Sequence, residues 1–332
     1  MSAAIVSFGE TMLHLSSPYG VRLEEASSFS CFVGGSESNT LACLARLGLE
    51  TIWISALPSH PLGRRVETEL RQYGINTAHV VWADSTARLG LYYALEAPNP
   101  LGHQVYYDRT FSACALINPD AADVSVVDGA RMLHLTGITL ALGEGPRQVF
   151  CRFLHRAREQ GVPLSFDVNY RSKLWPPDEA ARGIEEACQQ ARLLLCTRTD
   201  AEGIWGMTGS AESVLRQLAQ RFPGDGKRKT IVLTLGHEGA ADLTDNNYRE
   251  EPAYPTEGAF RFGSGDAFTA GYLYAYLEGV LYRELRATGN VTPLTFGNAF
   301  AALKRCLAGD IAYITQEEVK QLLQGQNRNL FR

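Results

Sequence analysis

The chain has 332 residues, 45% of them hydrophobic, and a formal net charge of −5, which argues against a surface built to bind nucleic acid or anionic lipid. Seven scattered cysteines without a Cys-x-x-Cys pair argue against a disulfide frame or a zinc site and are typical of a reducing cytosol, so we expect a cytoplasmic protein. The N-terminus lacks the pattern of a signal peptide, and no apolar run of about 20 residues predicts a membrane span.

The N-terminal third of the chain mixes buried and extended segments. The expected elements are a strand over 5–8, a helix from Gly35 to Gly48, a strand over 51–56, a helix over 63–73 and a hairpin over 89–107. Two segments, 12–32 and 80–112, lack a helical period and alternate as half-buried strands do. We therefore expect these two inserts to pair as one small sheet that acts as a lid.

From residue 120 onward, strands and helices alternate. The expected strands are 132–135, 163–168, 192–196, 230–235 and an arm over 248–254, and the expected helices are 146–160, 178–190, 211–222, 266–280, 294–307 and 317–324. This alternation predicts an α/β fold with a doubly wound, mostly parallel sheet, which binds ligands at the carboxyl ends of its strands. No linker or repeat is evident, so we expect a single domain over 1–332.

The most informative motif is Gly263-Ser264-Gly265-Asp266, which runs directly into a helix. Gly263 and Gly265 are expected to take positive φ, so that backbone N–H groups gather at the positive end of the helix and bind a phosphate. A carboxylate repels a resting phosphate, so Asp266 is better explained as the base for an attacking hydroxyl. The alternative is an ordinary N-cap.

Polar residues also follow the other expected strands. Asp167, Asn169 and Arg171 follow strand 163–168, where an arginine can grip a carboxylate or phosphate, or form a salt bridge within the loop. Residues 234–239 leave the expected strand 230–235 through glycines that suit either close approach to a flat ligand such as a purine, or packing alone. A motif Gly-x-Gly-x-x-Gly after the first strand and a P-loop are both absent, which argues against a Rossmann oxidoreductase and a P-loop kinase.

The expected lid carries a group of polar-tipped aromatic residues and one cation: Tyr92, Tyr93, Tyr106, Tyr107 and Arg109. Because side chains alternate along a strand, Tyr107 and Arg109 are expected to share a face. Such a set suits a small polyhydroxy acid, although tyrosines are also ordinary residues of half-exposed strands.

In this order, the motifs resemble the ribokinase-like family of sugar kinases along nearly the whole chain. Gly34-Gly35 with Asn39 resembles the family's N-terminal glycine motif, and residues 263–266 resemble its Gly-Ala-Gly-Asp motif, with Ser264 in place of alanine. Within the family the likeness is to the 2-keto-3-deoxygluconate kinases. It rests on four stretches, 57–63, 106–113, 166–175 and 302–310.

The resemblance implies that the chain uses ATP and Mg²⁺ to phosphorylate the terminal hydroxyl of 2-keto-3-deoxygluconate, which gives 2-keto-3-deoxy-6-phosphogluconate. Asp266 would be the base, and the N–H groups of Gly263, Ser264 and Gly265 would form the anion hole. The residues implied to hold the sugar acid are Gly34, Gly35, Ser36, Glu37, Ser38, Asn39, Tyr92, Tyr107, Arg109 and Arg171. Those implied on the nucleotide side are Asn169, Arg171, Thr234, Leu235, Gly236, Gly239, Gly263, Gly265 and Asn298.

Two segments depart from the family pattern. Thr197-x-x-Asp200 stands where the family has Asn-x-x-Glu, a motif associated with magnesium, so Asp200 is the implied metal ligand. Residues 260–262 replace Asp-Thr-Thr, which weakens a monovalent-cation site and brings Arg261 beside the anion hole as a candidate contact of the γ-phosphate.

The expected partners are a small sugar acid and ATP, together with further copies of the chain in a homo-oligomer formed through the lid. Alternatives within the same chemistry are a kinase for fructose, ribose or 2-keto-3-deoxygalactonate. An alternative of another class is a catalytically silent sugar-acid sensor, against which the intact Asp266 and its glycines argue.

Overall fold

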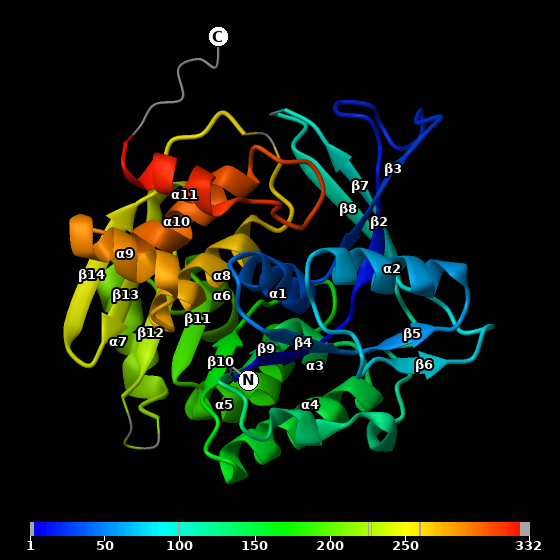
Figure 1. Ribbon diagram of the computed structural model, residues 1–332, viewed down its shortest axis with the longest axis horizontal. Coiled ribbons are helices and arrows are strands. Elements are labelled where there is room, and N and C mark those ends of the chain that lie inside the picture. The colour runs from blue at the N-terminus through cyan, green and yellow to red at the C-terminus, as the bar shows by residue number, and fades with distance from the viewer. Residues whose placement is uncertain (1–2, 99, 225, 227, 259, 326–332) are drawn as a thin grey trace.

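The core of the fold is an eight-stranded sheet in the order β14-β13-β12-β11-β10-β9-β1-β4 (Figure 1). The computed structural model describes residues 3–325 except 99, 225, 227 and 259. The strands from β12 to β4 are parallel, and β13 and β14 extend the sheet antiparallel at one edge. These strands are β1 (Ile5–Phe8), β4 (Thr51–Ile54), β9 (Met132–Thr136), β10 (Leu164–Asp167), β11 (Leu193–Thr197), β12 (Thr230–Thr234), β13 (Gly239–Thr244) and β14 (Asn247–Pro252).

Helices cover both faces of this sheet (Figure 1). One face carries α1 (Ser36–Arg46), α2 (Pro61–Gln72), α8 (Ser264–Tyr276), α9 (Val280–Thr288), α10 (Pro293–Lys304) and α11 (Gln316–Leu323). The other carries α3 (Gly137–Leu140), α4 (Glu144–Glu159), α5 (Pro177–Gln190), α6 (Arg198–Trp205) and α7 (Ala211–Arg221). The predicted doubly wound, mostly parallel α/β fold is confirmed. Among the described helices, none is both long and apolar enough to cross a lipid bilayer.

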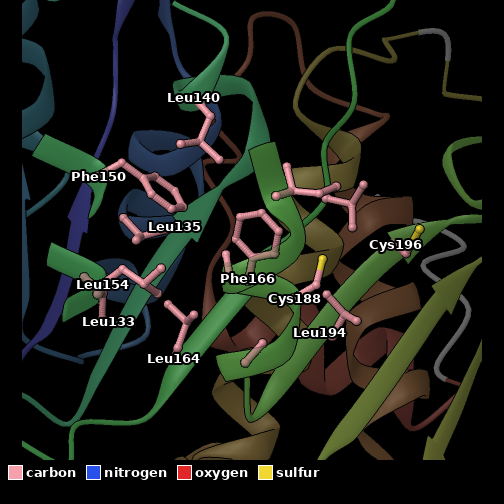
Figure 2. Packing of buried hydrophobic residues seen from close by; sticks show 14 of the residues in the cluster. Leu133, Leu135, Leu140, Phe150, Leu154, Leu164, Phe166, Cys188, Leu194 and Cys196 are labelled. Atoms are coloured by element: carbon pink, nitrogen blue, oxygen red, sulfur yellow. The ribbon is translucent and has the colours of Figure 1, made fainter. Parts of the chain in front are cut away.

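Consecutive residues of the parallel strands pack into different cores, because side chains alternate across a strand. In β9, Leu133 belongs to the cluster that includes α4 and α5, whereas Met132 belongs to the cluster that includes α1 and α8. Figure 2 shows the first cluster, in which Phe166 of β10 and Leu194 of β11 lie beside Cys188 of α5. Burial on both faces explains why these strands read as continuous apolar runs.

A separate four-stranded sheet, called here the small sheet, lies to one side of the main sheet (Figure 1). Its order is β3-β2-β7-β8, with bounds Met12–Ser16 for β2, Ser30–Gly34 for β3, Leu91–Glu96 for β7 and His103–Asp108 for β8. β2 pairs with β7, so the predicted pairing of the two inserts is confirmed. The expected hairpin tip includes Asn99, which lies outside the described residues. β6 (Val81–Ala83), in the second insert, pairs instead with β5 (Ala56–Pro58).

The helices α3, α6 and α9 and the strands β5 and β13 were not expected from the sequence pattern. α3 has four residues and α6 has eight, which is too short for a helical period to be visible. β13 is rich in alanine and begins with glycine, both weak strand formers, and it is held by its pairing with β12 and β14.

Candidate active site

The carboxyl ends of the parallel strands meet along one edge of the main sheet, where α/β folds bind ligands. The segments that leave this edge carry Glu10 after β1, Asn169 and Arg171 after β10, Asp200 in the first turn of α6 after β11, and Gly236 after β12. The N-terminal turns of α1 and α8 meet at the same edge, because side chains of α1 bond to Asp266 of α8.

Asp266 is held by hydrogen bonds to both of its carboxylate oxygens. Ser36 Oγ donates to Oδ1 at 2.7 Å, and Asn39 Nδ2 donates to Oδ2 at 2.7 Å. Asn169 Nδ2 donates in turn to Ser36 Oγ at 2.7 Å. Burial raises the pKa of Asp266, and the bonds from Asn39 and Ser36 lower it in part. Asp266 is therefore an oriented carboxylate of increased basicity, which is what a general base requires.

Ordinary helix capping does not account for Asp266. The N-cap of α8 is Gly263, three residues earlier, and no side chain caps this helix. Gly263 has a φ of 71°, and a Cβ there would lie 1.8 Å from the carbonyl oxygen of Asp310, so the turn requires glycine. Gly265, by contrast, lies inside the first turn of α8 without the expected positive φ. A Cβ at Gly265 would meet no atom within 4 Å, which leaves room for a ligand.

The expected anion hole is corrected at Ser264. Its N–H donates to the carbonyl of Arg261 at 3.2 Å, and its hydroxyl donates to the same oxygen at 2.8 Å. The N–H groups of Gly265 and Asp266 lie in the first turn of α8, where a helix offers no internal acceptor. These two amides are therefore available to an anion, and nothing in the hydrogen bonds of the described residues occupies the expected N–H of Gly263.

Glu37 belongs to the expected substrate set, but its side chain points into the core. It is 1% exposed, and its Oε1 accepts hydrogen bonds from Thr136 at 2.7 Å and Thr139 at 2.5 Å. Burial raises the pKa of Glu37 to about 7. Because the carboxylate is enclosed by these hydroxyls, Glu37 joins α1 to β9 and α3 beneath the cleft and does not reach a ligand.

Asn169 and Arg171 lie beside Asp266 and do not line the cavity at the N-terminus of α8, so their expected place on the nucleotide side is not borne out. Asn169 has a φ of 40°, which is uncommon for a non-glycine residue, and this conformation directs its amide to Ser36. Arg171 is exposed, and its Nη1 donates to the carbonyl of Tyr170 at 3.0 Å. Burial raises the pKa of both Asp266 and Asp200, and the positive charge of Arg171 lowers both pKa values in part.

Two further acids, Asp167 and Asp200, crowd the same edge. Burial, together with the negative charges of Asp200 and Asp266, raises the pKa of Asp167 to about 7. Within the part of the chain that the structure describes, no group of three or more His, Cys, Asp or Glu side chains is arranged to hold a metal. Mg²⁺ bound with a nucleotide needs only one or two carboxylates beside phosphate and water oxygens. The mutual repulsion of these acids fits such a site.

A cavity of about 770 Å³ opens beside the N-terminus of α8. Its lining residues are Thr234, Gly236, His237, Gly239, Ala253, Tyr254, Pro255, Thr256, Arg261, Ser264, Gly265, Phe268, Asn298, Ala301, Ala302 and Arg305. Most of the residues expected on the nucleotide side are therefore together. Leu235 is an exception, because it is 5% exposed and packs in the core. Asn298 Nδ2 donates to the carbonyls of Glu251 and Pro252, which fixes the cavity wall.

On the small-sheet side, Arg109 forms an ion pair that sequence analysis missed. Its Nε donates to Glu10 Oε2 at 2.8 Å, and its Nη2 lies 2.5 Å from the same oxygen. The two side chains are 8% and 2% exposed, and Nη1 of Arg109 is buried without a hydrogen-bond partner among the described residues. The guanidinium carbon lies 5.6 Å from the ring centre of Tyr107, so the two side chains lie together, as their spacing predicts.

Tyr92, another expected substrate residue, is anchored to the C-terminal part of the chain. Its hydroxyl donates to Asp310 Oδ1, and His14 Nδ1 lies 2.5 Å from Asp310 Oδ2. Gly34 passes so close that a Cβ there would lie 2.5 Å from the Tyr92 hydroxyl. Sequence reasoning also missed the role of Asp310. Glu10 could have been predicted as a site residue, because it follows the carboxyl end of the first strand, where α/β folds bind ligands.

The family model for the pfkB family carbohydrate kinases matches residues 2–316. The chain is 37% identical over 332 residues, all of both chains, to a 2-dehydro-3-deoxygalactonokinase of Haloferax volcanii. It is 28% identical to a 2-dehydro-3-deoxygluconokinase of Bacillus subtilis, over 98% of this chain and 97% of that protein. The crystal structure of a 2-dehydro-3-deoxygluconokinase from Thermotoga maritima superposes with a TM-score of 0.88 at 27% identity, covering 98% of this chain and 99% of that one.

Proposed function

The chain belongs to the pfkB family of carbohydrate kinases, and on that basis we propose that it transfers the γ-phosphoryl group of ATP to the terminal hydroxyl of a 2-keto-3-deoxy sugar acid. The observation that carries the proposal is Asp266, whose two oxygens are fixed by Ser36 and Asn39 beside two free amides of α8. A base and an anion site at one point are what phosphoryl transfer to a hydroxyl needs.

In the proposed reaction, the substrate hydroxyl gives its proton to Asp266 as its oxygen attacks the γ-phosphorus and the bond to the β-phosphate oxygen breaks. The N–H groups of Gly265 and Asp266 stabilise the charge on the transferred group, and Arg171, whose positive charge lowers the pKa of Asp266, would assist. Mg²⁺, held by Asp200 and Asp167 with the phosphates, would supply further neutralisation of charge.

The substrate carboxylate is assigned to Arg109, which directly follows β8 of the small sheet, and this sheet would act as the lid. Two of its guanidinium nitrogens are occupied by Glu10, and the buried Nη1 is left as a donor for one carboxylate oxygen. A donor buried without a partner is costly in the free protein and is satisfied by the correct ligand. This contact favours a sugar acid over a neutral sugar.

Two epimeric acids remain as candidates, 2-keto-3-deoxygluconate and 2-keto-3-deoxygalactonate. The four sequence stretches favour the first, and the identity of 37% with the Haloferax volcanii enzyme favours the second. A homo-oligomer formed through the small sheet stays a prediction, supported by exposed aromatic residues such as Phe29 and Tyr106.

The test is a coupled assay of the purified protein with ATP, Mg²⁺ and equal concentrations of both keto acids, ribose and fructose. We expect at least about a hundredfold preference in kcat/KM for a keto acid over either neutral sugar, because an unpaired buried donor disfavours a ligand without the carboxylate. If ribose or fructose matches the acids, the substrate assignment is wrong and the kinase remains. If no sugar is phosphorylated, the chain is better explained as a catalytically silent sugar-acid sensor.

A further inference from the structure

Two arginines line the nucleotide cavity, Arg261 and Arg305. Neither forms an ion pair with a carboxylate of the described residues, in contrast to Arg109. Nε of Arg305 is buried without a hydrogen-bond partner there, and its Nη2 donates only to the carbonyl of Gly258, at 3.3 Å. Arginine in a cavity wall without an acid is poised for a ligand that carries negative charge.

The two arginines come from distant segments that the backbone joins. The carbonyl of Arg305, at the end of α10, accepts a hydrogen bond from the N–H of Phe260 at 3.1 Å. The carbonyl of Arg261 accepts both the N–H and the hydroxyl of Ser264. Arg261 is therefore fixed at the turn that leads into the anion site, and Arg305 is fixed next to it.

The charge of this region is locally positive in an acidic protein. The lining residues that the structure describes include Arg261, Arg305 and His237 but no aspartate or glutamate, although the whole chain has a net charge of −5. The two arginines also act together on one neighbour. Burial lowers the pKa of His103 on β8, and the charges of Arg261 and Arg305 lower it further. A cavity of this kind attracts a polyanion.

We propose that Arg261 and Arg305 bind the phosphate chain of the nucleotide, with Arg261 at the terminal phosphate and Arg305 at the inner phosphates. The order follows from their positions, since Arg261 is bonded to Ser264 at the anion site and Arg305 lies beside Ala301 and Ala302 of the cavity wall. The assignment rests on the proposed kinase function, but it does not depend on which sugar is phosphorylated.

The experiment titrates adenosine, ADP and ATP against the protein by calorimetry, without sugar. Arg305→Gln should weaken ADP and ATP about tenfold each, or about 1.4 kcal/mol, because the variant loses a charge-assisted hydrogen bond to phosphate. Arg261→Gln should weaken ATP about tenfold and ADP less than about twofold. Neither variant should change the affinity for adenosine. Arg147→Gln, at an exposed position of α4 on the other face of the sheet, is the matched control and should change nothing.

Three results would overturn the proposal. Equal weakening of adenosine and ATP would mean that the arginines support the cavity wall and do not bind phosphate. Unchanged ATP affinity in both variants would mean that they are not ligands. Failure of Arg261→Lys and Arg305→Lys to recover any ATP affinity would mean that positive charge is not what the nucleotide requires. A wrong sugar assignment leaves all of these titrations unaffected, whereas failure of the unmodified protein to bind ATP would overturn the kinase itself.

Discussion

On one side of Asp266, Arg109 is buried and Glu10 balances its charge, whereas on the other side Arg261 and Arg305 line an open cavity with no described acid beside them. The two environments suit two kinds of anion. A small acid with one carboxylate needs a hydrogen-bond donor in a fixed position. The ion pair with Glu10 holds the guanidinium of Arg109 in one orientation and leaves one of its nitrogens free to donate. A phosphate chain carries several charges, and unpaired arginines supply the net charge that it needs.

The largest effect is expected at the residue that both sides share. Asp266→Asn keeps the size of the side chain and removes the base, so kcat should fall by roughly 10²- to 10⁴-fold, while both substrates still bind. In the unmodified enzyme, kcat should fall as the pH is lowered through a pKa above the usual 3.8, because burial raises the pKa of Asp266 and only the ionised form accepts a proton. Retention of more than about a tenth of the turnover would contradict the assignment.

The next largest effect is on the free energy of unfolding, which should respond differently to substitutions on the two sides of Asp266. Glu10→Gln leaves the buried guanidinium of Arg109 without its counter-charge, which should lower the free energy of unfolding by about 3–5 kcal/mol. Saturating keto acid should raise the melting temperature more in this variant than in the parent, since its carboxylate supplies the missing charge. Arg261→Gln has no such partner to leave behind and should be nearly neutral. If Glu10→Gln lowers the free energy of unfolding by less than about 1 kcal/mol, Glu10 does not balance a buried charge on Arg109, and the two sides do not differ in this way.

A double replacement tests recognition without the buried charge. Glu10→Gln with Arg109→Met removes both members of the pair, so much of the stability lost in Glu10→Gln should return. The KM for the keto acid should rise at least about thirtyfold, because the carboxylate contact is gone, and the KM for ATP should change less than about threefold. Steady-state kinetics with each substrate varied in turn would measure this. Equal rises for both substrates would count against a role of Arg109 in acid recognition.

The smallest effect concerns salt. Raising the NaCl concentration from about 0.05 to 0.3 M shortens the screening length, so the KM for ATP should rise about two- to fivefold as the open arginines are screened. The KM for the keto acid should rise less than about twofold, because its arginine is buried and already paired. A similar rise for both would show that the two sides do not differ in their electrostatics.

Periodicity and glycine positions predicted the layers of the fold, the pairing of the two inserts and the positive φ at Gly263. They succeeded because each depends on local pattern or on the rule that parallel strands end at one edge. The glycines of 234–239 were expected near a flat ligand because they follow a strand, whereas Asn298 was expected at the nucleotide side only through the family resemblance. Gly236, Gly239 and Asn298 all line the cavity.

The pairing of buried groups was not predictable in this way. Glu10 and Arg109 are 99 residues apart, and nothing in either segment specifies the other. Glu37 lies between two residues of the site, yet the helix turns it toward Thr136 and Thr139, because successive helical positions face different directions. The sequence also did not reveal that the N–H of Ser264 is unavailable to an anion. This N–H donates to the carbonyl of Arg261 in the turn that precedes α8.

Asp310 has a consequence for redesign of the enzyme. Its backbone oxygen packs against Gly263, and its carboxylate binds Tyr92 of the small sheet, so one residue touches both the turn before α8 and the small sheet, to which we assign sugar recognition. The small sheet is therefore not an interchangeable module. A graft that brings the specificity of another relative must carry a matching residue at 310 with it, or retain Tyr92, if the turn at Gly263 is to keep its shape.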